Sequence, residues 1–286
     1  MRKTIIAATL ATAALAVPNL AAAQAAAAPA AAPASPHTIT GNVGLFSSYR
    51  FRGIDQTFGK PALQGGVDYS HSSGFYAGNW NSNVNQGAGF PGGNLEMDFY
   101  GGWKNTWGDW GLDLGAIYYY YPGTNALITG PILLQNNRTL AIHTGKVDNT
   151  ELYIGGSWKF ISLKYSHAVS DYFDTPGTKG SHYLDLSANY DLGGGWGING
   201  HLGHLNFKNM TNGSYSDWKI GVTKDIGGWV FAASYIDTNA KGSCNPAVTT
   251  PQPYCFSNGN INAAGGFDKV KDAGRSTVVI SVSKTF

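Results

Sequence analysis

Alternation of apolar and polar residues is clearest in the last eleven residues of the chain. Val278, Ile280, Val282 and Phe286 fall on one face of an extended strand, and small, mostly polar residues fall on the other. Successive side chains of a strand point to opposite faces, so this stretch predicts a strand between an apolar and a polar environment. Such a strand, ending in an aromatic residue, is typical of the closing strand of a membrane β-barrel. An edge strand of a soluble β-sandwich is the alternative.

The same two-residue period recurs along the chain and divides it into about 12 strands. Apolar sets that we expect to face outward run from Ile39 to Phe51, Leu63 to Tyr69, Tyr76 to Val84, Leu95 to Trp103, Trp110 to Tyr120, Leu152 to Phe160, Leu163 to Val169, Leu184 to Tyr190, Trp196 to Leu202, Trp218 to Val222, Trp229 to Tyr235 and Val278 to Phe286. In this register Tyr49, Phe51 and Trp80 face outward. Tyr119 and Tyr121 face inward, where an aromatic platform for a sugar is an open alternative. The pattern predicts an all-β fold, a transmembrane antiparallel up-and-down β-barrel of about 12 strands.

The connections between the expected strands alternate in length. Tight turns are expected at 72–74, 107–109, near 160, at 191–195 and at 225–228, and longer connections at 53–60, 85–93, 122–149, 171–180, 208–214 and 238–274. Membrane barrels have short periplasmic turns and long extracellular loops, whereas a soluble sandwich has no reason for strict alternation. The alternation therefore favours the barrel and predicts that both ends of the mature chain lie on the periplasmic side.

The first residues have the organisation of a secretory signal. Arg2 and Lys3 precede an apolar run, and Ala21–Ala23 fit a cleavage site of small residues. We expect residues 1–23 to be a signal peptide, residues 24–37 to be a flexible Ala/Pro-rich segment and residues 38–286 to be the barrel. This organisation predicts export and insertion into a bacterial outer membrane.

Composition agrees with export and narrows the range of functions. Charged residues make up 13% of the chain, against about 25% in an average soluble domain. Without Arg2 and Lys3 the chain has 17 basic and 17 acidic residues, so it lacks the basic surplus of a nucleic-acid-binding protein. Cys244 and Cys255 lie close together in a polar segment, and an oxidising compartment favours a disulfide between them. Neither has another Cys or a His at metal-ligand spacing, so no metal site is expected.

Five segments resemble a known family. They are Tyr49–Gln56, Pro61–Tyr69, Gly74–Gly78, Asn94–Gly102 and Trp158–Ser166. These segments are similar to those of the TorF family of porin-like outer-membrane proteins of proteobacteria, and the likeness extends from about Thr38 to Phe286. The resemblance implies a barrel and a pore, but it carries over no solute, cofactor or catalytic residue. The connections 122–149 and 238–274 are long for this family.

Charged residues of both signs fall on the inward faces of the expected strands. They are Arg50, Arg52, Asp68, Glu96, Asp98, Lys104, Asp113, Glu151, Lys159, Lys164, Asp185 and Lys219. Rings of charged side chains set ion selectivity in channels, so these are the candidate pore-lining residues, and Glu96 and Asp98 are expected to favour cations. Barrels of about 8 strands are filled by side chains and those of 16 to 18 strands hold a channel. Twelve strands are compatible with an open pore and with a plugged barrel.

A passive outer-membrane pore for small solutes or ions is the function that these features predict. It needs no cofactor and no catalytic residue; its partners would be membrane lipid, the solutes and, through Phe286, the barrel-assembly machinery. Two alternatives remain: a plugged barrel that acts in adhesion through its long loops, and an outer-membrane enzyme. Ser166 and His167 point to opposite faces of one strand, which excludes them as a nucleophile and base, and leaves His201 and His204 as candidates for an enzyme.

Overall fold

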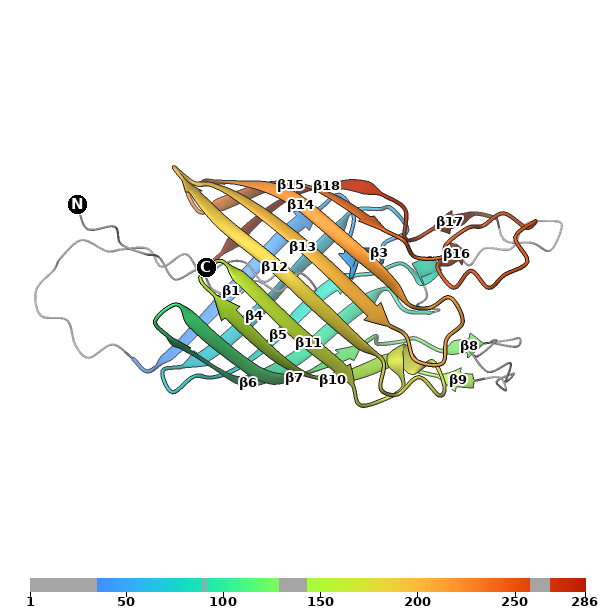
Figure 1. The fold of residues 1–286 in the computed structure, drawn as a ribbon, viewed down its shortest axis with the longest axis horizontal. Coiled ribbons are helices and arrows are strands. Elements are labelled where there is room, and N and C mark those ends of the chain that lie inside the picture. The colour runs from blue at the N-terminus through green and yellow to red at the C-terminus, as the bar shows by residue number, and fades with distance from the viewer. Residues whose placement is uncertain (1–34, 89, 91, 129–142, 258–267) are drawn as a thin grey trace, which may run out of the picture.

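The structure is a computed structural model that describes residues 35–88, 90, 92–128, 143–257 and 268–286. Twelve strands form a closed antiparallel barrel (Figure 1). The barrel strands are β1 (His37–Phe46), β4 (Ala62–His71), β5 (Phe75–Asn83), β6 (Leu95–Trp107), β7 (Trp110–Tyr120), β10 (Asp148–Trp158), β11 (Ile161–Ala168), β12 (His182–Gly193), β13 (Trp196–Asn206), β14 (Tyr215–Ile226), β15 (Trp229–Thr238) and β18 (Thr277–Thr285). The predicted fold class is confirmed. The expected signal peptide and most of the Ala/Pro-rich segment lie outside the described residues.

Short elements lie in the connections. They are β2 (Arg50–Phe51), β3 (Ile54–Asp55), β8 (Ala126–Ile128), β9 (His143–Gly145), β16 (Cys255–Ser257), β17 (Val270–Asp272) and the 3-10 helices η1 (Gln86–Ala88) and η2 (Tyr172–Asp174). The short strands pair as β2 with β3, β8 with β9 and β16 with β17. In the part of the chain that the structure describes, no helix is long and apolar enough to cross a membrane.

The first and last barrel strands close the ring. β1 pairs with β4 on one side and with β18 on the other, where the register runs from Asn42↔Thr285 to Phe46↔Ser281. The final residue, Phe286, exchanges backbone hydrogen bonds with Gly41. Phe286 is therefore part of the closing ladder, and its role as an assembly signal stays a prediction.

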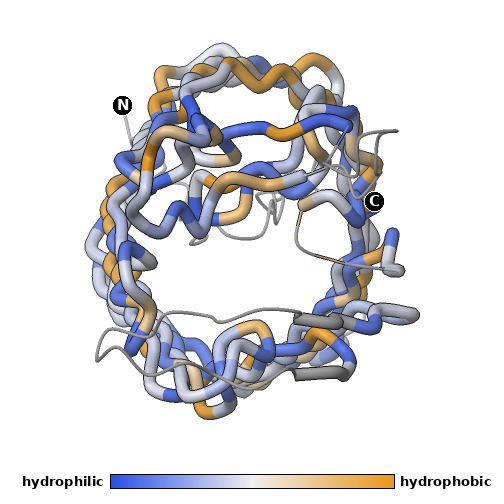
Figure 2. The backbone as a smooth tube through the Cα atoms, turned by 90° about the vertical axis from the view of Figure 1, so that its right-hand side faces the viewer, coloured by the Kyte–Doolittle hydropathy of each residue, from blue (hydrophilic) through white to orange (hydrophobic). Residues whose placement is uncertain are grey.

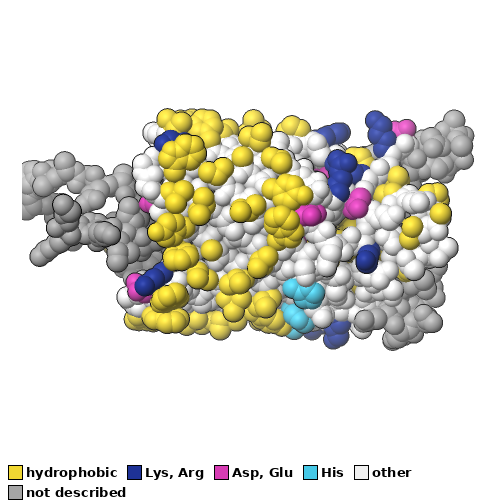
Figure 3. All heavy atoms as spheres, turned by 45° about the horizontal axis from the view of Figure 1, so that its top comes forward, with side chains coloured by type: hydrophobic (Ala, Val, Ile, Leu, Met, Phe, Trp, Pro, Cys, Tyr) yellow, Lys and Arg dark blue, Asp and Glu magenta, His cyan; other side chains and the backbone are white. Residues whose placement is uncertain are grey.

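The outer face of the barrel is apolar. Large apolar side chains lie exposed on every barrel strand, among them Ile39, Leu152 and Ile280. In Figure 3 they cover much of the barrel wall, and polar side chains gather toward one end. An exposed apolar surface of this extent is not that of a soluble monomer, and it matches the lipid-facing band of a membrane barrel. The barrel is thus a transmembrane one.

The two ends of the barrel differ. Tight turns connect the strands at one end, which we call the turn end, and six long connections lie at the other, the loop end (Figure 1). β1 begins and β18 ends at the turn end. The predicted alternation of short and long connections is therefore present.

The first expected strand is wrong beyond Phe46. The pattern predicts Tyr49 and Phe51 on its outer face, but β1 ends at Phe46 and both side chains are buried. Residues 47–61, which we call the inner hairpin segment, fold back into the barrel; Figure 2, which looks at the loop end, shows chain within the outline of the wall. A membrane strand needs about 9–11 residues, so β1 is complete at Phe46.

The third expected strand has the opposite register. The pattern places Tyr76, Trp80 and Val84 outside, whereas in β5 it is Phe75 that is exposed, and Trp80 is only 1% exposed. The Trp80 ring faces inward because Tyr49 of the inner hairpin segment covers it, with ring centroids 5.4 Å apart. The inward-folded segment thus supplies an apolar partner that the strand pattern alone does not include.

Candidate functional site

The inner hairpin segment forms a β-hairpin with a two-residue turn inside the barrel. β2 and β3 pair so that Arg52 and Gly53 make the turn. Their φ angles, 49° and 80°, are both positive, as the type I′ turn of a tight hairpin requires. A Cβ on Gly53 would collide with side chains of the barrel wall, among them Asp217 on β14. The hairpin tip is therefore fitted closely against the inside of the wall.

Arg52, at this tip, forms an ion pair with the opposite wall. Its Nη1 and Nη2 atoms lie 2.9 Å and 2.7 Å from the two carboxylate oxygens of Glu151 on β10, and both side chains are buried. Arg52 Nη1 also donates to the Tyr172 hydroxyl at 2.9 Å. Burial alone would lower the pKa of Arg52, but Glu151 raises it well above its ordinary value, so the guanidinium stays charged. Because β10 lies across the barrel from β1, this pair ties the segment across the bore.

Asp55 fixes the other arm of the hairpin to the loop end. Lys271 on β17 places Nζ 2.7 Å from Asp55 Oδ2, and Arg50 Nη2 lies 3.7 Å from the same oxygen. Burial by itself raises the pKa of the Asp55 carboxyl, but the charge of Arg50 and the hydrogen bond from Lys271 outweigh burial and lower it. The carboxylate is therefore ionised at neutral pH, and it links the inner hairpin segment to the long connection between β15 and β18.

Two of the predicted acids lie beside the hairpin, and none of the described lysines and arginines pairs with them. Glu96 and Asp98 on β6 face inward, as predicted, and both are 0% exposed. Tyr49 donates a hydrogen bond of 3.2 Å to Glu96 Oε1. Among the described residues, Glu96 Oε2 and both carboxylate oxygens of Asp98 have no hydrogen-bond partner. Burying an ionised carboxylate without a partner is costly, so these two groups carry little charge where the hairpin covers them.

A cluster of one histidine and two aspartates lies on the inner faces of β12, β13 and β14. His201 Nδ1 is 3.1 Å from Asp185 Oδ1, and His201 Nε2 is 2.9 Å from Asp217 Oδ2. Tyr183 donates a hydrogen bond of 2.7 Å to Asp217, and Ser187 donates one of 2.5 Å to Asp185. The Ser187 hydroxyl oxygen also lies 3.4 Å from His201 Nδ1, so the serine, the histidine and the two aspartates form one buried network. Asp185 is one of the predicted pore-lining residues and Asp217 is not, although both alternate with outward apolar residues.

Most of the other predicted charges are also inside and meet aromatic side chains. Tyr100 donates to Asp68 at 2.5 Å, Tyr76 donates to Asp113 at 2.6 Å, Lys104 Nζ lies 5.1 Å from the Tyr76 ring centroid and Lys164 Nζ lies 3.9 Å from the Tyr153 ring centroid. Lys219 on β14 is opposite His201 in the strand register. Arg50 and Arg52 are inside as well, but on the hairpin and not on the first barrel strand.

Lys159 is the exception among the predicted pore-lining residues. It lies in the tight turn between β10 and β11, with φ 55°, and its side chain is about half exposed. Its Nζ atom is 3.8 Å from Asp109 in the neighbouring turn. Lys159 therefore lies at the turn end and does not face the bore, because the strand alternation ends one residue earlier, at Trp158.

The other sequence-based candidates are placed as follows. Cys244 and Cys255 form the expected disulfide in the connection between β15 and β18. Ser166 is buried inside the barrel, and His204 is exposed on the outside. No group of three or more metal-ligating residues occurs within the described residues.

The fold and the interior define a class of protein: a membrane-spanning β-barrel whose bore is narrowed by a hairpin of its own chain. The chain belongs to the family described as "Bacterial protein of unknown function (Gcw_chp)", whose family model matches residues 30–286. No curated protein matches the chain. The resemblance to the TorF family by name stays a prediction.

Solved barrels of similar extent differ widely in sequence from this chain. A KdgM porin has 7% identity and a TM-score of 0.47, with 87% of this chain and 98% of that chain covered. A TodX deltaS2S3 mutant monoaromatic hydrocarbon channel has 9% identity and a TM-score of 0.47, covering 88% of this chain and 90% of that chain. OmpT of Vibrio cholerae has 10% identity and a TM-score of 0.37, with coverage of 87% and 97%.

Proposed function

We propose that this protein is an outer-membrane channel for small solutes or ions, with a passage narrowed by the inner hairpin segment. One observation carries the proposal. The hairpin and its side chains fit inside the barrel. The inward side chains of the barrel strands therefore do not fill the interior by themselves. Charged groups of both signs surround that interior, as expected where hydrated solutes pass.

The location follows from the two ends and the outer face. The apolar outer face suits a lipid bilayer, and short turns at one end with long connections at the other are typical of bacterial outer-membrane barrels. In this orientation the loop end is extracellular, and the inner hairpin segment narrows the extracellular half of the passage. Export would rely on the expected signal peptide, and assembly on the closing strand and Phe286.

Single-channel recording in a planar bilayer tests the proposal. The barrel is compared with a variant in which residues 48–58 are replaced by a Gly/Ser linker. We expect small discrete current steps from the natural chain and larger steps from the variant, because the linker cannot hold an ion pair with Glu151. Deleting residues 245–250, which lie in a loop outside the bore, is the matched control and should leave the step size unchanged.

A plugged barrel that acts in adhesion is the second candidate. The pairing of Arg52 with Glu151 favours it, since a buried, two-pronged ion pair holds the hairpin firmly in the bore. Silent bilayers from both folded proteins, natural chain and linker variant, would contradict the channel and favour this role.

A further inference from the structure

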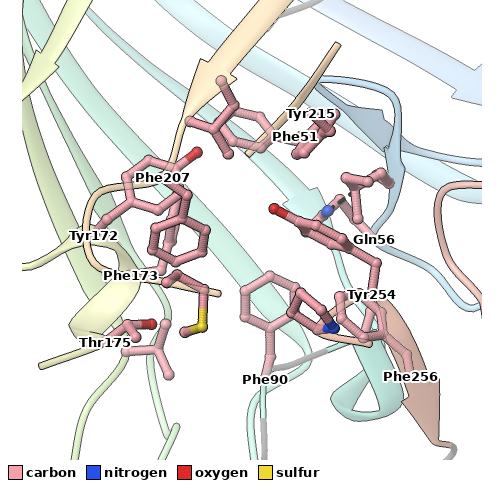
Figure 4. A pocket seen from close by; sticks show the side chains of 16 residues that line it. Phe51, Gln56, Phe90, Tyr172, Phe173, Thr175, Phe207, Tyr215, Tyr254 and Phe256 are labelled. Carbon is pink, nitrogen blue, oxygen red and sulfur yellow. Dashed lines mark hydrogen bonds between the residues drawn. The ribbon is translucent and has the colours of Figure 1, made fainter. Parts of the chain in front are cut away.

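A pocket of about 230 Å³ lies at the loop end, above the hairpin. Sixteen residues line it, and Figure 4 shows their side chains around a hollow, among them Phe51, Tyr172, Phe173, Phe207, Tyr215 and Tyr254. The lining residues come from all six long connections or the strand ends beside them. Because these connections start from the whole circumference of the barrel, the pocket lies over the bore.

The lining is apolar and uncharged. Half of the 16 lining residues are Phe or Tyr, and none is Asp, Glu, Lys, Arg or His. The tyrosine hydroxyls already have protein partners: Tyr215 donates to the Arg52 carbonyl at 2.8 Å, Tyr254 donates to the Gly213 carbonyl, and Tyr172 accepts from Arg52. The pocket therefore offers mainly ring faces and edges to a ligand, in contrast to the charged bore below it.

The rings around the pocket pack edge to face. The Tyr172 ring is 4.7 Å from Phe173 and 5.0 Å from Phe207, with interplanar angles of 85° and 70°. Tyr215 and Tyr254 meet in the same way at 4.9 Å and 78°. This geometry is the one that aromatic rings prefer among themselves, so a further ring can join it with little rearrangement.

Backbone strain holds one of these rings in position. Phe173 has φ 46° and ψ 49°, a left-handed conformation that is unusual for a bulky residue. Its ring contacts Phe51 of the hairpin at 5.6 Å and lines the pocket. Such strain is found at ligand sites, where the surrounding structure maintains it.

We propose that this pocket binds a small, uncharged aromatic compound of one or two rings. An apolar cavity of about 150 Å³ is large enough for benzene, so the volume here suits a molecule somewhat larger than a single ring. An ionised group would lose its hydration without gaining an opposite charge in the lining. The site does not depend on conduction through the barrel, because binding needs only the folded loop end.

Fluorine NMR of the full barrel in detergent micelles tests this site. The probe is 4-fluorobenzyl alcohol, and 4-fluorobenzoate is its charged counterpart; micelles without protein give the baseline. We expect saturable line broadening with the alcohol and at least about ten-fold weaker binding of the benzoate. Thr175→Phe and Met210→Trp, two substitutions in different connections, should fill the pocket and weaken binding of the alcohol at least ten-fold. Val248→Trp, outside the lining in the β15–β18 connection, is the matched control and should bind like the natural chain.

Any one of the following results would overturn the proposal. They are broadening no greater than that of empty micelles, equal binding of the alcohol and the benzoate, and unchanged binding by both pocket-filling variants when each migrates as a folded barrel. Loss of binding in Val248→Trp would also count against it, because that substitution leaves the pocket unfilled. Conductance is not measured, so failure here is distinct from failure of the channel.

Discussion

At the scale of single residues, one positive charge holds the hairpin across the bore. Arg52 lies at the hairpin tip, in a left-handed conformation beside Gly53, and reaches Glu151 on the opposite wall. Both side chains are buried, so each depends on the other to offset the cost of leaving water. Breaking such a pair by removing one partner is far more harmful than replacing both.

We therefore expect Arg52→Met to lower the free energy of unfolding by about 3–5 kcal/mol, because Glu151 is left as a buried, unpaired charge. The double variant Arg52→Met, Glu151→Met should recover most of the loss. Urea unfolding of barrels folded into lipid vesicles measures both values. The exposed pair Lys159–Asp109 is the control, and Lys159→Met should change stability by less than about 1 kcal/mol. A double variant as unstable as the single one would contradict the ion-pair explanation.

Acidification should loosen the hairpin through Asp55. Arg50 and Lys271 hold the pKa of Asp55 in the folded chain below its unfolded value of about 3.9. A lowered pKa contributes stability that is present above the unfolded pKa and is lost as the pH falls through the folded pKa. We expect the channel current to rise below about pH 4 and the Asp55 contribution to stay constant between pH 5 and 8. Asp55→Asn should remove this acid response; a variant that keeps it would exclude Asp55 as the cause.

At the scale of elements, the strands could be predicted wherever one face meets lipid. In β18, Val278, Ile280 and Val282 alternate with small residues, and the structure has them outside as the pattern predicts. The prediction fails where a second part of the chain covers a strand from within. Trp80 faces the bore because Tyr49 lies against it, and no local pattern reports such a contact. A first strand from Ile39 to Phe51 was also longer than the membrane requires, a signal that could have revealed the hairpin.

The disulfide is expected to support the pocket more than the barrel. Cys255 lies between Tyr254 and Phe256, which both line the pocket, and its ring to Cys244 spans a sequence separation of 11. A ring of this size restricts only its own loop in the unfolded chain. Replacing both cysteines by Ser should weaken binding of 4-fluorobenzyl alcohol several-fold and leave the barrel's thermal unfolding nearly unchanged. A large drop in unfolding temperature would show that the loop stabilises the wall itself.

At the scale of the whole molecule, the charged residues that face the interior could be predicted, but the pocket at the loop end could not. The two-residue period puts Glu96, Asp98 and Asp185 inside, since they alternate with outward apolar residues. The pocket could not be read from the sequence, because its lining residues come from six separate connections without a regular pattern. Three-dimensional convergence of distant segments leaves no local periodicity.

The unpaired acids should affect the ion preference of the proposed channel once the hairpin no longer covers them. Glu96 and Asp98 lie buried beside the hairpin, without a cation within the described residues. In the variant with residues 48–58 replaced by a Gly/Ser linker, we expect the further changes Glu96→Gln and Asp98→Asn to lower the ratio of cation to anion permeability several-fold, measured as a shift of the reversal potential in a salt gradient. Lys159→Gln, at the turn end, should leave the reversal potential unchanged. An unchanged potential in the acid variant would remove both residues from the constriction.

The ring of the barrel closes where the hairpin begins. Ser47, the first residue of the inner hairpin segment, hydrogen-bonds through its backbone N–H to the carbonyl of Ile280 on β18, which follows the other barrel strands in the sequence. The hairpin tip then rests on β10 and β14, which are also made after it. During biogenesis the segment can therefore reach its final position only after these later strands have taken their places in the barrel.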